Sequence, residues 1–325
     1  MPPRPFQQLP FDELPDLPRV AHGHFRSQRV DAVLDSRGFG KLSVHYRVQG
    51  SGPPLLLVHG LMTSSYSWRY VIEPLAHRFT VYAPDLPGSG RTAKPDASYH
   101  PDALADWIGD FLRQVGIRGC PTIGNSLGGY LCMRLALRDG GAMSRLVNLH
   151  SPGVPLARLH ALRFALSLPG SARLLAALVA RDPERWVHRN VHYYDETLKS
   201  REETVEYAEP LTTPEGVNAF TRILRETLDP RHMAAFTTEL AARRARAEPF
   251  PVPLQLVYVP RDPMVPPAVG DKLRALVPSA DFVPLDHASH FAHVDNPAGF
   301  LAVALPFLTG EAARAAGPDS ARHRA

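Results

Sequence analysis

Cysteine is scarce in this sequence, with two residues in 325, so disulfides do not organise the fold. Cys120 and Cys132 are predicted to be buried, reduced thiols, which favours a cytoplasmic protein. Long hydrophobic runs are also missing. The longest, such as residues 55–58 and 174–180, fall far short of the roughly 20 residues that a membrane helix requires. Residues 1–8 have no apolar core of the kind that secretory signals contain. We therefore expect no membrane span.

Neither sign of charge is in large excess. The formal net charge is +4, and the densest basic cluster, residues 243–246, has Glu239 and Glu248 close to it in the sequence. A solvated helix face explains such a cluster, and the chain shows no motif typical of nucleic-acid binding. We expect a small-molecule partner instead. Residues 1–26 and 311–325 have the composition of disordered segments.

Apolar segments alternate between the periods of strands and helices over most of the chain. Residues 29–34 and 42–48 predict two opening antiparallel strands. The later alternation of strands and helices predicts an α/β fold whose central sheet is mostly parallel and has helices on both faces. The strands are expected at 55–58, 79–83, 121–123, 146–149, 254–259 and 280–285, and the helices at 101–115, 127–137 and from about 297.

Residues 151–249 differ, because their pattern predicts helices with no strand between them. We interpret this segment as a helical lid inserted into a core made of residues 27–150 and 250–310. The helices are expected at 159–166, 171–180, 183–188, 201–207, 214–227 and 231–246. Apolar residues early in the lid are candidate walls of a substrate cavity, although core packing is the more common reason for an apolar helix face. These candidates are Leu159, Leu162, Phe164, Leu166 and Leu168.

The sequence Gly124-Asn125-Ser126-Leu127-Gly128 joins a predicted strand to a predicted helix. Small residues two positions before and after a serine allow the backbone to turn sharply and hold the hydroxyl clear of the sheet. This G-x-S-x-G pattern is a nucleophile elbow, and it makes Ser126 a candidate nucleophile. An ordinary glycine-rich turn is the alternative interpretation.

An activated serine needs a base, an orienting acid and donors for an oxyanion. His287, His290 and His293 lie on one loop after the strand at 280–285, and each is a candidate base. Asp262 follows the strand at 254–259, at the edge where open α/β sheets gather their sites. The amide of Leu61, in the turn after the strand at 55–58, and the amide of Leu127 are the expected oxyanion donors.

The order of these parts resembles the α/β-hydrolase superfamily from about residue 29 to residue 308. His59-Gly60 follows an early strand, the turn Asp85-Leu86-Pro87-Gly88-Ser89-Gly90 comes next, and the serine, aspartate and histidine follow in that order. The stretch from Phe291 to Pro297 resembles the family's segment after the catalytic histidine. The resemblance therefore implies a triad of Ser126, Asp262 and His290.

Other acids are weaker candidates. Asp85 belongs to a glycine-rich turn, while Asp286 and Asp295 stand too close to the histidine in sequence to reach behind it easily. Some relatives carry the acid after the strand that follows the elbow. Residues 148–153 contain no carboxylate there, which strengthens Asp262.

The resemblance implies a hydrolase that needs no cofactor and no metal. Epoxide hydrolases and haloalkane dehalogenases of this fold use an aspartate nucleophile, so Ser126 favours hydrolysis of a small or medium apolar carboxylic ester. Met62, Asn125 and Phe291 are expected to contact the substrate. The alternative is a carbon–carbon bond hydrolase acting on a diketone-like ring-cleavage product, whose elbow string is similar. A receptor that only binds its ligand is a third possibility, and it would not need all three triad residues.

Overall fold

One eight-stranded sheet with the order β1-β2-β4-β3-β5-β6-β7-β8 forms the centre of the computed structural model, which describes residues 6–311. The expected strands are all present, which confirms the α/β class. The disorder predicted for residues 1–5 and 312–325 falls outside the described residues. The strands are β1 (Gln28–Ser36), β2 (Gly40–Gln49), β3 (Pro54–Val58), β4 (Thr80–Pro84), β5 (Thr122–Asn125), β6 (Leu146–Leu149), β7 (Leu254–Tyr258) and β8 (Asp281–Pro284).

The sheet is antiparallel at its start and parallel from β4 onward. β1 pairs with β2, and β2 with β4, in the antiparallel sense, and the other neighbouring strands pair in parallel. Leu55, Leu56, Leu57 and Val58 in β3 are all fully buried. A continuous apolar run of this kind is typical of a parallel strand that is covered on both faces. The carboxyl ends of β3, β5, β6, β7 and β8 therefore meet at one edge of the sheet.

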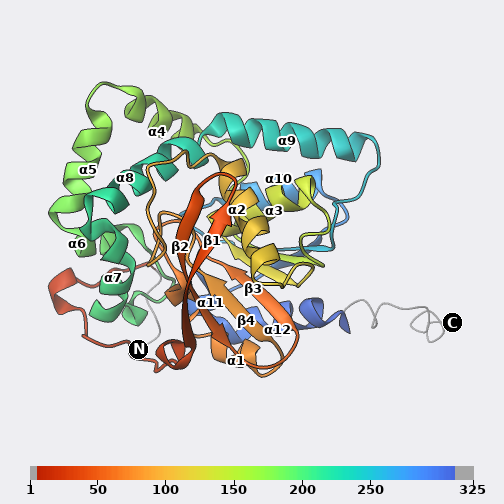
Figure 1. Ribbon diagram of the computed structural model, residues 1–325, viewed down its shortest axis with the longest axis horizontal. Coiled ribbons are helices and arrows are strands. Elements are labelled where there is room, and N and C mark those ends of the chain that lie inside the picture. Colours follow the sequence, from red (N-terminus) through yellow and green to blue (C-terminus); the bar gives the residue numbers. More distant parts are fainter. Residues whose placement is uncertain (1–5, 312–325) are drawn as a thin grey trace.

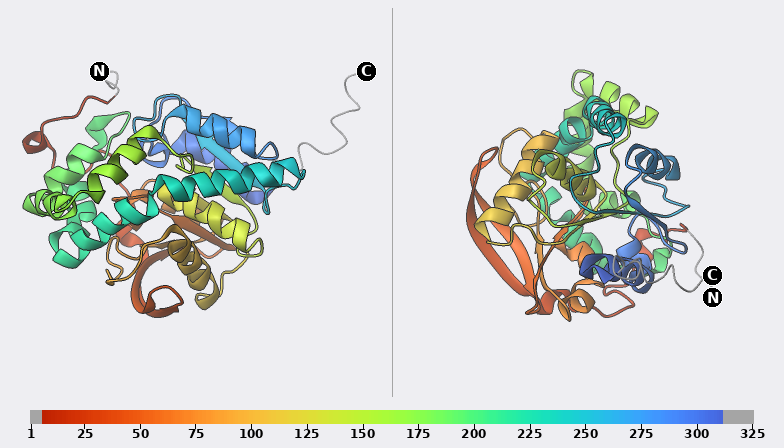
Figure 2. Two further views of the ribbon diagram at one scale, coloured as in Figure 1. Left: turned by 90° about the horizontal axis from the view of Figure 1, so that it is seen from above. Right: turned by 90° about the vertical axis from the view of Figure 1, so that its right-hand side faces the viewer.

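Helices cover both faces of the sheet (Figures 1 and 2). On one face, α2 (Pro101–Gln114), α3 (Leu127–Arg138) and α10 (Pro267–Leu276) enclose a core that contains Trp107 and Tyr130. On the other face, α1 (Ile72–Ala76) and α12 (Pro297–Thr309) enclose a second core around Trp68 and Phe300. Cys120 and Cys132 are buried and free.

The segment between β6 and β7 is helical, as predicted, and forms the top and the left-hand side of the molecule in Figure 1. Its helices are α4 (Ala157–Ser167), α5 (Ser171–Arg181), α6 (Pro183–Asn190), α7 (Arg201–Ala208), α8 (Pro214–Arg222), a π-helical turn (Ile223–Thr227) and α9 (Pro230–Ala245). We call residues 151–249 the helical insertion.

A buried ion pair fastens the helical insertion to the core. Arg69, in the turn before α1, contacts the carboxylate of Glu203 on α7, and both side chains are almost completely buried. Tyr193 donates its hydroxyl to the same Glu203 oxygen at 2.9 Å. A buried charge that loses its partner is strongly destabilising, so the base of the insertion is held against the core.

Residues 6–26, predicted to be disordered, instead follow a defined path along the helical insertion. The amide of Arg201 donates to Pro15 O at 2.8 Å, Arg185 pairs with Asp12 at 2.6 Å, and His24 is fully buried. This proline-rich segment predicts disorder because its apolar residues follow neither the period of a helix nor that of a strand. The partners that order this segment lie about 170 to 190 residues away in sequence, which composition does not reveal.

No single helix among residues 6–311 combines the length and the apolar composition that crossing a bilayer requires, although α4 and α5 meet that test as a pair bent by 101°.

Candidate active site

Ser126 stands at the turn between β5 and α3 with an unusual backbone conformation. Its φ is 52° and its ψ is −121°, and such angles cost a non-glycine residue roughly 1–3 kcal/mol. It is also the only residue of 122–130 that is not buried. The strained turn thus holds the serine out of the packed interior.

The glycines beside Ser126 are required by close backbone approaches. A Cβ at Gly124 would lie 2.6 Å from Gly129 Cα, and one at Gly128 would lie 2.3 Å from Val58 O. Both distances are shorter than real Cβ contacts, so any side chain would push α3 away from β3 and β5. The glycine spacing in the sequence therefore has the physical cause expected for an elbow.

The turn after β3 brings Leu61 next to the elbow. His59 is fully buried, accepts from the Leu86 amide through Nε2 at 2.9 Å, and is left to donate from Nδ1 to Gly60 O at 2.8 Å. Burial lowers the pKa of His59, in keeping with this neutral tautomer. The turn is thereby fixed. Leu61 and Leu127 line the same cavity as Ser126, and the first amides of a helix such as α3 have no partner inside it.

Asp262 and His290 meet at the carboxyl ends of β7 and β8. His290 Nδ1 lies 2.7 Å from Asp262 Oδ2, while Asp262 Oδ1 accepts from the amides of Met264 and Val265 at 2.6 and 2.9 Å. Burial alone would raise the pKa of Asp262, but the imidazoles of His290 and His150 outweigh it and hold the pKa well below its usual range. The carboxyl group is therefore ionised at neutral pH.

A cavity of about 410 Å³ lies between the helical insertion and the core, and Ser126 and His290 line it. Its wall is mostly apolar, and Arg158 is the one permanently charged side chain on it. The wall includes Leu61, Met62, Leu127, Leu156, Leu159, Leu162, Leu175, Trp186, Phe220, Met264 and Phe291. Of the expected substrate contacts, Met62 and Phe291 are thus on the wall.

Comparison with known proteins agrees with this arrangement. The family model of the alpha/beta hydrolase fold matches residues 53–297. The chain belongs to the alpha/beta hydrolase fold family. An uncharacterized protein of Mycobacterium tuberculosis is 29% identical over 277 residues, which are 81% of this chain and 77% of that protein. The 2-hydroxy-6-oxo-6-(2'-aminophenyl)hexa-2,4-dienoic acid hydrolase of Metapseudomonas resinovorans is 26% identical over 281 residues, covering 84% of this chain and 90% of that enzyme.

Solved structures give the same family architecture. The epoxide hydrolase CorEH without ligand superposes with a TM-score of 0.73 at 21% identity and covers 87% of this chain and 99% of its own. At this identity the likeness concerns the alpha/beta hydrolase fold alone.

One expected substrate contact of this alpha/beta hydrolase and three of the candidate lid walls lie elsewhere. Asn125 is fully buried and does not line the cavity; its amide donates to His290 O at 3.0 Å and to Leu149 O at 3.3 Å. It ties the histidine loop to the elbow strand. Of the candidate lid walls, Leu159 and Leu162 line the cavity, Leu166 is buried outside it, and Phe164 and Leu168 are exposed on the opposite side of α4. The helical period of the sequence does not show which side of α4 lines the cavity.

His150 is a feature that the sequence analysis did not single out. It directly follows β6, has a φ of 54°, is fully buried, and places Nδ1 3.1 Å from the Asp262 oxygen that His290 also contacts. Burial lowers its pKa, with Asp262 opposing and His290 adding to the effect, so the ring is neutral. In the sequence, residues 148–153 stand out only because they contain no carboxylate. A histidine at the same edge of the sheet was the available signal.

The ligating atoms of His150, Asp262 and His290 all lie within 4.8 Å of one another, which makes this trio the candidate metal group within the described residues. A histidine nitrogen binds a metal only when it is unprotonated. Here His290 Nδ1 hydrogen-bonds to one oxygen of an ionised carboxylate, and His150 Nδ1 lies 3.1 Å from the same oxygen, so Asp262 already faces the nitrogen of each ring that a metal would need.

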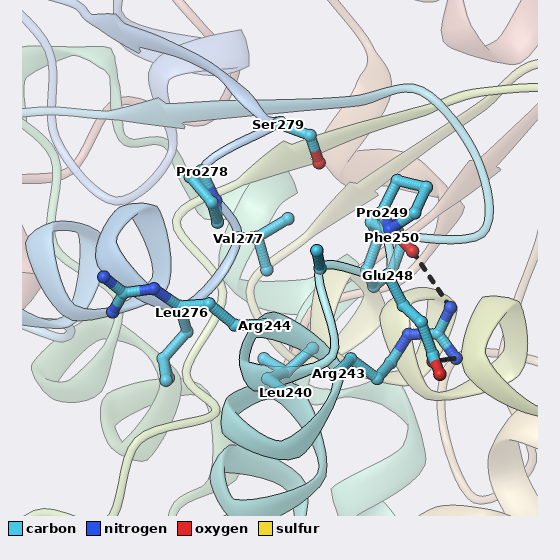
Figure 3. A pocket seen from close by; sticks show the side chains of 11 residues that line it. Leu240, Arg243, Arg244, Glu248, Pro249, Phe250, Leu276, Val277, Pro278 and Ser279 are labelled. Carbon is cyan, nitrogen blue, oxygen red and sulfur yellow. Dashed lines mark hydrogen bonds and ion pairs between the residues drawn. The ribbon is translucent and has the colours of Figure 1, made fainter.

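Another hollow, at the end of α9, has no such chemistry (Figure 3). The guanidinium of Arg243 donates to Pro249 O at 2.9 Å and pairs with Glu248 at 3.4 Å. Arg246 pairs with Glu248 as well, at 2.6 Å. The basic cluster at 243–246 is thus partly neutralised on a helix face, as its composition predicted.

Proposed function

We propose that the protein is a serine hydrolase that cleaves a small or medium apolar carboxylic ester. The observation that carries this proposal is that Ser126, in a strained elbow, and His290, bonded to a buried aspartate, line one apolar cavity. Ser126 Oγ attacks the ester carbonyl while His290 Nε2 accepts its proton. The proton then passes to the departing alcohol, and a water molecule activated by His290 releases the acid from the acyl-enzyme.

The surrounding charges favour the transition state of this reaction. An ionised Asp262 stabilises the imidazolium that forms on His290 and holds its Nδ1–H in place. The amides of Leu61 and Leu127 would bind the oxyanion, and removal of one such donor typically costs roughly 10²- to 10³-fold in turnover. The helical insertion forms one wall of the cavity and acts as the lid in this proposal.

The cavity supports the choice of substrate. Its volume is about 410 Å³ and its wall is mostly aliphatic and aromatic. An apolar acyl chain gains by leaving water, at roughly 0.8 kcal/mol for each buried methylene group. The gain ends when the cavity is full, so the preferred chain length measures the free space beside Ser126.

Turnover of nitrophenyl esters is therefore expected to rise with acyl chain length and then fall. Leu162→Trp, which fills part of the cavity from α4, is expected to move the optimum to shorter chains and to lower kcat/KM for longer ones by about tenfold or more. Ala165→Trp, on the exposed side of the same helix, is the matched control and should keep the original optimum. An unchanged optimum in Leu162→Trp would place the acyl chain elsewhere.

A carbon–carbon bond hydrolase is the second candidate, favoured by the similarity to the Metapseudomonas resinovorans enzyme and by Arg158, a cation on the cavity wall suited to a carboxylate substrate. Assaying a ring-cleavage dienoate beside the ester panel would test this alternative. Faster turnover of the dienoate than of every ester would select this reaction. A covalent serine probe that fails to label the protein would instead favour a receptor without catalytic activity.

A further inference from the structure

Two helices of the insertion are apolar on both sides although only one side is covered. Leu159 and Leu162 of α4 and Leu175 of α5 face the cavity. Away from the cavity, four large apolar side chains are between 50% and 67% exposed. These are Phe164, Leu168, Leu174 and Leu178, and we call them the outer apolar face. A helix that is apolar all round normally has apolar surroundings all round, so this face lacks its partner.

The outer apolar face is concentrated in one place. The described residues contain nine exposed large hydrophobic side chains, and four of them lie within residues 164–178. α4 and α5 meet there at an angle of 101°, at an outer corner of the molecule (Figures 1 and 2). Exposed apolar residues scattered singly need no explanation, but a cluster at a projecting corner marks a contact surface.

Positive charge accompanies this face. Residues 157–181 contain four arginines and neither aspartate nor glutamate. Leu178 also borders a hollow that Arg181, Arg185 and Arg189 line. Arg185 pairs with Asp12 and Asp182, whereas Arg181 and Arg189 form no ion pair within the part of the chain that the structure describes. Two uncompensated guanidinium groups thus stand beside the exposed leucines.

We propose that the outer apolar face and the arginines beside it dock on the surface of an anionic phospholipid bilayer. The apolar side chains enter the boundary between headgroups and acyl chains, and Arg181 and Arg189 contact headgroup phosphates. A protein partner would need acidic side chains at the same spacing, whereas a bilayer offers an apolar layer directly beneath a plane of phosphates. Docking does not depend on the proposed reaction. It would, however, hold the wall of the cavity against the bilayer, in which an apolar substrate dissolves.

Vesicle sedimentation tests this proposal with the full chain. Binding to vesicles of phosphatidylcholine with phosphatidylglycerol is expected, with much weaker binding to phosphatidylcholine alone and a decline as salt is raised. Leu174→Asp with Leu178→Asp should weaken binding about tenfold or more. Arg181→Glu with Arg189→Glu should do the same. Val33→Asp with Val205→Asp, which alters two comparably exposed side chains elsewhere, is the control and should bind like the unaltered protein.

Thermal unfolding verifies that each variant is folded. Binding to neither vesicle type, or equal binding by all variants, would overturn the proposal. So would a dimer in solution that Leu174→Asp with Leu178→Asp dissociates, because a second copy would then be the partner of this face. None of these measurements uses catalysis, so failure of the proposed function would not affect them.

A different observation carries a second inference, which rests on the proposed function. Two imidazoles share one oxygen of Asp262, with His290 Nδ1 at 2.7 Å and His150 Nδ1 at 3.1 Å. His150 adopts a positive φ, which is uncommon for a residue other than glycine, and this conformation places its ring behind the aspartate. The geometry assigns His150 as a positioning residue that orients Asp262 and shares its negative charge.

The groups that face His150 are few. Asp262 Oδ2 lies 3.1 Å from His150 Nδ1. The ring centroids of His290 and of Tyr258 on β7 lie 5.8 and 5.4 Å from the centroid of the His150 ring. Tyr258 donates its hydroxyl to Ser151 O at 2.8 Å. His293 lies deeper, fully buried, and burial holds its pKa well below the usual range. His290 is thus the side chain that hydrogen-bonds to Asp262 Oδ2, and His150 is the only other side chain paired with that oxygen among the described residues.

His150→Phe removes the nitrogen that lies 3.1 Å from Asp262 Oδ2 and keeps a ring of similar size. The full charge of Asp262 would then act on the imidazolium of His290, so the acid limb of the kcat/KM profile is expected to move to higher pH by about half a unit or more, with kcat lowered about tenfold. His150→Asn carries a donor at the place of Nδ1 and should restore both values. Equal midpoints in all three proteins would reduce His150 to a packing role.

The NMR signal of the His290 Nδ1 proton supplies a readout without turnover. We expect it to shift in His150→Phe and to return in His150→Asn. A signal that is the same in all three proteins would overturn the assignment even if no substrate were found.

Discussion

Replacing Ser126 with alanine is expected to reduce ester hydrolysis by roughly 10⁴- to 10⁶-fold while the protein stays folded. Alanine offers no nucleophile, yet it occupies the same space and tolerates the same turn, and the serine hydroxyl makes no hydrogen bond to another described residue whose loss would destabilise the fold. Turnover of the best nitrophenyl ester and the thermal unfolding midpoint are the two measurements.

Labelling by a fluorophosphonate probe separates the nucleophile from other serines. Ser167→Ala, an exposed serine on α4, is the control and should keep both labelling and turnover. The probe should label the unaltered protein but not a His290→Ala variant, because the serine must lose its proton to react. Ester turnover that survives in Ser126→Ala at the original rate would remove this residue from the reaction.

Local signals were sufficient to predict the elbow and most of the fold. The glycines at 124 and 128 are recognised from their spacing around Ser126 within five residues, and the strand β3 is a short, wholly apolar run. The helices of the insertion were likewise predicted within a few residues of their bounds, because their apolar residues recur at the spacing of a helix. Such signals depend only on neighbouring residues, so a single sequence contains them.

The interactions that complete the site depend on residues far apart in the sequence. Asn125 contacts the carbonyl of His290 across 165 residues, and His150 reaches Asp262 only because β6 and β7 are neighbours in the sheet. Neither pairing has a local pattern. The same limit explains Phe164 and Leu162, which belong to one apolar helix but face solvent and cavity respectively. Only the tertiary packing decides which side is covered.

Asp262→Asn is expected to lower kcat by roughly two to four orders of magnitude with little change in KM. The amide has the same shape, but its nitrogen can present a donor to His290 Nδ1 and so stabilise the wrong tautomer for accepting the serine proton. The loss of negative charge also removes the stabilisation of the imidazolium. Asp262 does not line the cavity, which is why substrate affinity should be nearly unchanged.

Two other aspartates near His290 serve as controls for that substitution, and their surroundings differ. The side chain of Asp286 is exposed, so Asp286→Asn should leave turnover near its original value. Asp295 is half-buried, and it accepts from the amides of Ser289 at 2.7 Å and Tyr194 at 3.1 Å. Burial raises the pKa of Asp295 to about 7, so an amide resembles its protonated form and Asp295→Asn should cost far less than Asp262→Asn. Near-normal turnover in Asp262→Asn beside an inactive control would transfer the role of the acid to that control residue.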